Sequence, residues 1–173
     1  NFFGNPFHGL YVNNNGNITF SNAFPDYTPD SITAESNPII AAFWADVDTE
    51  GGAAGAATLG GHSTGSNLVY YTLDTVNHVL TITWDDVGYY SSHTDKLNAF
   101  QIQLIGLGNG DFDIVFRYEV VNWTTGDVTG HNGLGGTPAR VGYSAGDDDP
   151  NHYFELHPQS GNQNSLLALE STA

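Results

Sequence analysis

The segment from Pro38 to Glu50 constrains the fold more than any other part of the chain. Its apolar run, Ile39 to Trp44, has the length of a strand and predicts one that is buried on both faces. Two carboxylates follow the run, and the spacing of Asp46 and Asp48 puts both side chains on one face of an extended chain. Two acids at the end of a buried strand need stabilising partners: backbone N–H donors, a cation or the groups of a catalytic site.

The charge balance excludes one large class of partner. The 173 residues include 19 Asp and Glu but only three Lys and Arg, so the formal net charge is -16. We expect no nucleic acid partner, because that affinity comes largely from Lys and Arg that neutralise phosphates. An anionic membrane surface is disfavoured for the same reason, and no apolar run approaches the length that crosses a bilayer. The acid excess instead favours solubility in salt, repulsion between copies, or binding of divalent cations.

Short alternating or aromatic-rich segments, separated by turns of Asn, Asp and Gly, predict β-strands along the whole chain. The first expected hairpin has the turn Asn13–Gly16, where Asn and Gly tolerate positive φ. The expected strands are 10–12 with 17–20, 69–73 with 79–84, 100–104 with 112–120, and then 39–44, 140–144, 153–156 and 165–170. Two loops, 51–65 and 124–138, interrupt the pattern, and no segment keeps a helical period. We therefore predict one all-β domain, an antiparallel β-sandwich over residues 1–173.

Seven blocks of sequence, in chain order, are typical of one known family. They are residues 6–16, 18–20, 39–49, 83–90, 95–101, 123–126 and 142–146, and they include the intact Phe43–Asp48 core. With these blocks the chain resembles the nidogen-like (NIDO) domain, an extracellular module found in nidogen, tectorin-type matrix proteins, membrane-bound mucins and bacterial secreted proteins. Asp86 departs from the family pattern, in which an amide is expected at that position.

The resemblance implies an adhesive or assembly role outside the cell, in a matrix or at a cell surface, without known catalysis. The partner that it implies is an extracellular protein or a glycan, and the sequence indicates no particular oligomeric state. The acid-rich, cysteine-free composition favours a bacterial secreted or surface-anchored member of the family.

Asp46 and Asp48 are candidate ligands of a structural calcium ion, with help from Asp85, Asp86 or Asp95. Calcium takes about six to eight oxygen ligands, which carboxylates gathered at the ends of loops can supply. An Asp-x-Asp pair by itself is a weak signal, because a loop site needs several more oxygens. The alternative is that each Asp accepts hydrogen bonds from nearby backbone N–H groups where the chain turns. Both interpretations stay open at the level of sequence.

Exposed aromatic rings would favour a carbohydrate-binding module, because such rings stack on the apolar faces of sugars. Tyr89, Tyr90, His93 and Trp123 are the candidates for this ligand surface. Consecutive aromatic residues on a strand point to opposite faces, so one of Tyr89 and Tyr90 is expected in the core. Tyr90 lies next to a Ser- and Thr-rich turn and is the better candidate for an exposed ring.

A hydrolase is the remaining alternative, with a carboxylate pair drawn from Glu50, Asp46 and Asp48. Asp85 and Asp86 are adjacent, and adjacent acids on a strand point to opposite faces, so these two are not expected to act on one bond. No second feature of the sequence supports catalysis, and we expect a non-catalytic module.

Overall fold

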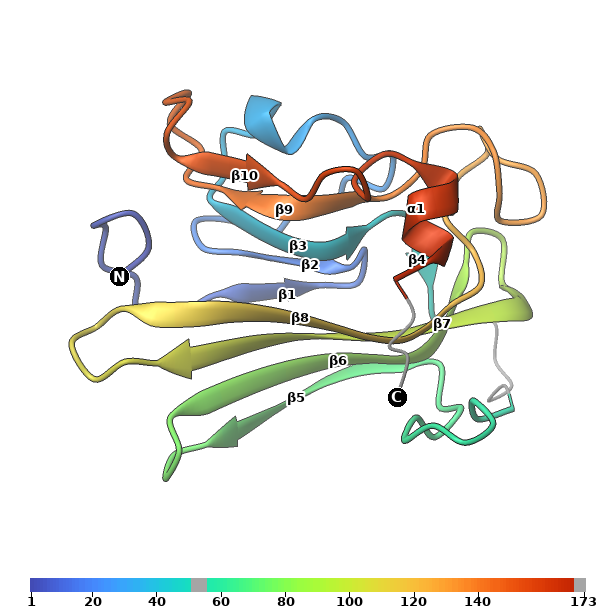
Figure 1. The fold of residues 1–173 in the computed structure, drawn as a ribbon, viewed down its shortest axis with the longest axis horizontal. Helices are drawn as coiled ribbons and strands as arrows, with labels where there is room; N and C mark the ends of the chain where they lie inside the picture. Colours follow the sequence, from blue (N-terminus) through green and yellow to red (C-terminus); the bar gives the residue numbers. More distant parts are fainter. Residues whose placement is uncertain (51–55, 170–173) are drawn as a thin grey trace.

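The fold consists of two antiparallel sheets (Figure 1), in a computed structural model that describes residues 1–50 and 56–169. The main hydrophobic core lies between these sheets. The first sheet has the order β1-β2-β3-β9-β10, formed by β1 Tyr11–Asn13, β2 Asn17–Thr19, β3 Ile39–Trp44, β9 Arg140–Ser144 and β10 Tyr153–Glu155. The second sheet has the order β4-β6-β7-β8, and β5 pairs with β6 outside this path. Its strands are β4 Val47–Asp48, β5 Leu68–Asp74, β6 Val79–Tyr89, β7 His93–Gly106 and β8 Phe112–Val121. The predicted single all-β sandwich is confirmed.

The expected hairpins form, with register pairs such as Val12 with Ile18 and Ile102 with Phe116. The expected loop 124–138 contains no strand, and residues 51–55 of the other expected loop lie outside the described residues. The helical elements in the described ranges are a 3-10 turn, η1 Ile32–Ala34, and the short helix α1 Gln163–Leu167. No helix in the described part of the chain is long and apolar enough to span a membrane.

Strand β3 is buried on both faces, as its unbroken apolar run predicts, and all of its residues are buried. Ile40 and Ala42 face the main core between the sheets. Ile39 and Trp44 face a smaller cluster on the other side, which residues 24 and 32 complete. A register shift in the pairing with β9, between Ala41 and Trp44, breaks the regular alternation, so that the neighbours Ala42 and Phe43 both face the main core.

The predicted strand at 165–170 is wrong, because this segment is part of helix α1 up to Leu167. Asn162 caps the helix, and its side-chain oxygen accepts a hydrogen bond from Ser165 N at 3.1 Å. Leu166 is fully buried in the main core, with Leu167 and Leu169 packed at its margin. A short apolar run does not distinguish a strand from one turn of helix, and here the cap decides.

The hairpin turn Asn13–Gly16 packs directly against β3. Gly16 has φ +76°, and a Cβ atom built there would lie 1.8 Å from the carbonyl oxygen of Phe43. Phe43 N also donates a hydrogen bond to the Gly16 carbonyl at 3.1 Å. Position 16 therefore requires glycine for two reasons, its backbone conformation and the close approach of the neighbouring strand.

We expect Gly16→Ala to lower the free energy of unfolding by about 3 kcal/mol or more, because the clash adds to a left-handed backbone cost of about 1–2 kcal/mol. Gly135→Ala is the matched control, since Gly135 has φ +75° but nothing within 4 Å of a built Cβ. That variant should lose only the backbone cost of about 1–2 kcal/mol. Urea unfolding measures both values, and equal losses would contradict the role of the contact with Phe43.

Candidate functional site

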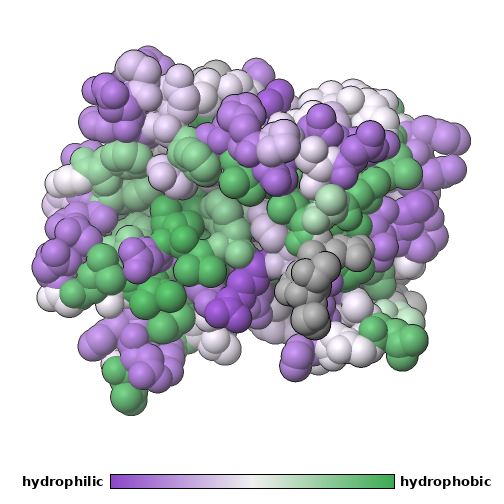
Figure 2. All heavy atoms as spheres, viewed as in Figure 1, coloured by the Kyte–Doolittle hydropathy of each residue, from purple (hydrophilic) through white to green (hydrophobic). Residues whose placement is uncertain are grey.

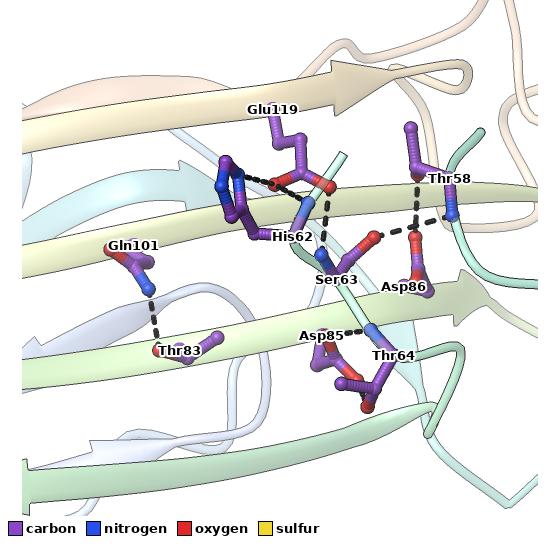
Figure 3. A network of polar contacts seen from close by, with 9 residues as sticks. All are labelled: Thr58, His62, Ser63, Thr64, Thr83, Asp85, Asp86, Gln101 and Glu119. Atoms are coloured by element: carbon purple, nitrogen blue, oxygen red, sulfur yellow. Dashed lines mark hydrogen bonds and ion pairs between the residues drawn. The ribbon is translucent and has the colours of Figure 1, made fainter. Parts of the chain in front are cut away.

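Asp85 and Asp86, in strand β6, hold the loop 58–66 against the second sheet (Figure 3). The Asp85 carboxylate accepts hydrogen bonds from Thr64 N at 2.8 Å and Ser66 N at 3.0 Å. The Asp86 carboxylate accepts one from Gly65 N at 2.7 Å. Both acids are almost completely buried. Their donors are backbone N–H groups and the hydroxyls of Thr58 and Thr64, all in one loop, as the capping alternative predicts.

A β-bulge turns these two neighbours toward the same loop. Asp86 has φ +50°, and the pairing of β6 with β7 shifts register between Trp84 and Val87. The expectation that adjacent acids point to opposite faces is therefore wrong for Asp85 and Asp86, because regular alternation fails at a bulge.

The hydrogen bonds keep Asp85 ionised. Burial by itself would raise the pKa of this carboxyl, but the bonds from Ser66 and Thr64 outweigh it and lower the pKa to about 2. Asp85 thus carries a full negative charge at neutral pH, and the loop N–H groups stabilise that charge.

Glu119 of strand β8 holds the same loop from the neighbouring side, a role that the sequence did not predict. Its carboxylate accepts hydrogen bonds from His62 N at 2.8 Å and Ser63 N at 2.9 Å (Figure 3). Ser63 is the centre of a Gly-x-Ser-x-Gly pattern at residues 61–65. The pattern lies in a loop that leads into strand β5 instead of a helix, so it does not form the strand-to-helix turn of a serine hydrolase.

Asp48 accepts backbone hydrogen bonds where β4 ends. One carboxylate oxygen accepts from Glu50 N at 2.7 Å, and the other accepts from Ser92 N at 2.9 Å in the turn between β6 and β7. Asp48 therefore joins two turns of the chain, as the capping interpretation predicts.

Asp46 lies beside Asp48 at a surface pocket of about 590 Å³. The turn 13–15 forms one wall, and Tyr27 and Glu50 also line the pocket. The Asp48 carboxylate accepts two backbone N–H groups, whereas the Asp46 carboxylate accepts no hydrogen bond from the described residues. Burial, then the nearby Asp127 and Asp48, raises the pKa of the Asp46 carboxyl to about 6.

Asp127 is the member of this site that the sequence analysis missed. Its carboxylate accepts hydrogen bonds from the Thr28 hydroxyl at 2.6 Å and Thr129 N at 2.9 Å. It follows Gly126, whose built Cβ would lie 2.2 Å from the Asp46 carbonyl oxygen, so the two segments are in direct backbone contact. The sequence feature that could have pointed to Asp127 is the family block 123–126, because this block ends directly before that residue.

Asp95 lies in another place, where it accepts a hydrogen bond from the Tyr89 hydroxyl at 2.8 Å and pairs with Lys96 at 3.0 Å. The candidate acids therefore do not converge: Asp46 lies near Asp48, whereas Asp85 and Asp86 bind the loop 58–66. In residues 1–50 and 56–169, no group of three or more His, Asp or Glu side chains is arranged to hold a metal ion.

The candidate aromatic residues divide between core and surface. Trp123 is fully buried, and its indole N–H donates to the Val87 carbonyl at 3.0 Å. Tyr89 is also buried and stacks on His93, with ring centroids 4.8 Å apart. Tyr90 is 45% exposed, in agreement with the alternation argument. Trp123 and Tyr89 fill the core, whereas Tyr90 and His93 are exposed at the surface.

Fold and site together define a β-sandwich module whose acids hold its loops. The nidogen-like domain family matches residues 8–173, and the chain belongs to this family. Membership makes it an extracellular domain, as the resemblance implied.

The chain is 32% identical over 184 aligned positions to nidogen of Drosophila melanogaster, and this alignment covers 99% of the chain and 13% of nidogen. It is 33% identical over 173 aligned residues to alpha-tectorin of Mus musculus, and this alignment covers 84% of the chain and 7% of alpha-tectorin. The chain thus spans 13% or less of these relatives. Both are animal proteins and lend no support to the predicted bacterial source. No solved structure matches the chain.

We expect Asp85→Asn to cost about 2 kcal/mol of unfolding free energy at pH 7, given a folded pKa of about 2 against an ordinary 3.8. Because the folded pKa is depressed, this contribution is complete above pH 3.8 and is lost as the pH falls toward 2. The difference in unfolding free energy between wild type and variant should therefore narrow as the pH falls from about 4 to about 2, measured by urea unfolding.

Asp113→Asn is the control for this experiment, because Asp113 is exposed on β8 and should give no gap at any pH. If the loss of unfolding free energy caused by Asp85→Asn stayed constant down to about pH 2, it would result from changed geometry, and the role of the charge would be contradicted.

Proposed function

We propose that this domain is a non-catalytic extracellular module for adhesion, which joins a cell surface or matrix to another protein or to a glycan. The observation that carries the proposal is a row of exposed apolar side chains along β5 within a domain of the nidogen-like family. Tyr71 and Leu73 lie on one face of the strand and are 67% and 62% exposed, and Leu68 on the opposite face is 53% exposed. Contiguous exposed apolar side chains on a soluble domain mark interaction surfaces.

The use of the acids supports a non-catalytic role. A carboxylate pair in a hydrolase must reach its substrate. Asp85 and Asp86 are buried under the loop that they bind, and Asp48 accepts two backbone N–H groups. Asp46 and Glu50 line the open pocket and are the residues that a hydrolase would use. A screen for glycan or peptide turnover that Glu50→Gln abolishes would overturn the proposal.

A carbohydrate-binding module is the second candidate, and the Asp46 pocket favours it. Tyr27 is 56% exposed at this pocket, beside the side chains of Asn14, Asp48 and Glu50. An exposed ring next to amide and carboxylate groups has the composition of a sugar site, since the ring stacks and the polar groups accept hydroxyl hydrogen bonds. Tyr90 offers a further exposed ring.

We propose that calcium is a structural cofactor of this module, with Asp46 and Asp48 as its carboxylate ligands. The raised pKa of Asp46, which burial and two nearby carboxylates cause, is the situation that a bound cation would relieve. Asn14 and Glu50 line the same pocket and carry further side-chain oxygens. Backbone carbonyls and water would supply the other ligands, as in many extracellular calcium sites.

The adhesion proposal predicts that beads coated with the domain attach to cultured cells or to a deposited matrix more strongly than beads coated with an unrelated acidic protein. The acidic control separates specific binding from charge. Treatment of the target with glycosidases tests the second candidate: lost attachment assigns the ligand to glycan, and retained attachment assigns it to protein. Attachment equal to that of the control protein would contradict adhesion.

The calcium proposal predicts that 10 mM CaCl2 stabilises the domain by about 1.4–2.7 kcal/mol, if Kd is about 0.1–1 mM as in extracellular modules. Asp46→Asn and Asp48→Asn should remove this effect, whereas Asp113→Asn should retain it. Thermal melting at constant ionic strength, with NaCl as the reference salt, separates site binding from screening of the net charge. No heat in calorimetric titration and no melting shift would contradict the proposal.

A further inference from the structure

Strand β5 forms an open edge of the second sheet (Figure 1). It pairs with β6 on one side, and no strand within the described residues pairs with its other side. Alternate residues of Leu68–Asp74 therefore direct their N–H and C=O groups away from the sheet. The unpaired edge can accept the backbone of one more strand.

This edge lacks the features by which proteins usually prevent strand addition. Such features include Lys, Pro and β-bulges. Residues 68–74 contain no Lys or Pro, and their pairing with β6 runs from Leu68–Asp85 to Asp74–Val79 without a register shift. The strand is therefore regular, and its residues are apolar or aromatic except Thr72 and the terminal Asp74.

The core face of the second sheet continues onto β5 and is exposed there. Tyr71 pairs with Ile82, which belongs to the main core, and Leu73 pairs with Leu80, which is partly buried and packs against that core. Ile82 is fully buried, whereas Tyr71 and Leu73 are mostly exposed. The core face thus extends beyond the residues that cover it, and an added strand could bury its own apolar side chains beside Tyr71 and Leu73.

A hollow of about 720 Å³ adjoins this surface at the end of the sheet. Leu73, Leu80 and Phe112 line it with apolar atoms. Asp74 and Asp111 also line the hollow. Figure 2 shows hydrophobic residues at the surface on the left side of the molecule, where Figure 1 places the ends of strands β5 to β8. Apolar side chains next to Lys or Arg would match this combination of groups.

The negative charge of the domain favours a basic partner at this edge over a second copy of the chain. Residues 68–89, which form the β5–β6 hairpin, contain three Asp and no Lys or Arg. A second copy would bring another net charge of -16 against this edge, which is unfavourable. A basic partner would instead be attracted, and opposite charge would speed its association.

We propose that β5 binds an extended, basic segment of another extracellular protein, which adds to the sheet as an extra strand. Apolar side chains alternate with Lys or Arg in this segment: the apolar ones contact Tyr71 and Leu73, and the basic ones approach Asp74 and Asp111. Such β-augmentation derives affinity from backbone hydrogen bonds and specificity from alternate side chains. The inference rests on the adhesive function proposed above and names its partner class and binding edge.

The test uses a fluorescein-labelled peptide of about nine residues in which Lys alternates with Val or Ile, titrated with the domain in fluorescence polarisation. Two control peptides have the same charge. One has the same composition in block order, and the other carries N-methyl groups on alternate amides, which remove backbone donors. The alternating peptide should bind at least about tenfold more tightly than either control.

Domain variants locate the site. Leu73→Ser should weaken the alternating peptide about tenfold, whereas Val128→Ser should leave its affinity unchanged. Val128 is the matched control, since it is a 73% exposed apolar residue in the loop 124–138. Because both side chains are exposed, both variants should keep the melting temperature of the wild type, which is measured in parallel.

The outcomes that would overturn the inference differ from the one that would overturn the adhesive function. Equal affinity for all three peptides would show charge attraction without strand addition. A dimer of the wild type that Leu73→Ser dissociates in analytical ultracentrifugation would assign the edge to a second copy. Bead attachment that Leu73→Ser leaves intact, without peptide binding, would refute the β5 edge and keep the adhesive function. Peptide binding without any attachment would instead refute adhesion.

Discussion

The turn Asn13–Gly16 contacts both sheets at once, and the arrangement of the whole sandwich depends on it. Its Gly16 carbonyl accepts a hydrogen bond from Phe43 N in β3 at 3.1 Å. The Asn14 carbonyl accepts one from the Trp84 indole of β6 at 2.8 Å. These bonds satisfy the backbone of a turn that would otherwise be buried without partners, and they place the two sheets relative to each other.

The acids that attracted a functional interpretation lie where the chain crosses between the sheets. Strand β3 belongs to the first sheet and β4 to the second, with Ala45 and Asp46 between them. A crossing of this kind leaves turns whose N–H groups need acceptors, and Asp48 supplies one to Ser92. Asp46 is left at the pocket beside the crossing. The same few residues therefore connect the two sheets and line the candidate ligand site.

Local patterns predicted most of the fold and only part of the site. The hairpins and the two-faced burial of β3 follow from alternation and turn chemistry, which operate over a few residues. The failures have specific causes: the Asn162 cap made 163–167 helical, and the bulge at Asp86 reversed the expected side-chain direction. Glu119 was missed because its hydrogen bonds reach a loop far away in the chain.

The sequence by itself determined the strand-forming segments, the acidic surface and the family, because each depends on residue type and local order. Only the tertiary structure decided which acids are neighbours. It separated Asp85 from Asp46, brought Asp127 beside Asp46, and left β5 uncovered at the edge of its sheet. Those outcomes depend on how distant strands pair and where one sheet ends over the other, and no local pattern records such long-range contacts.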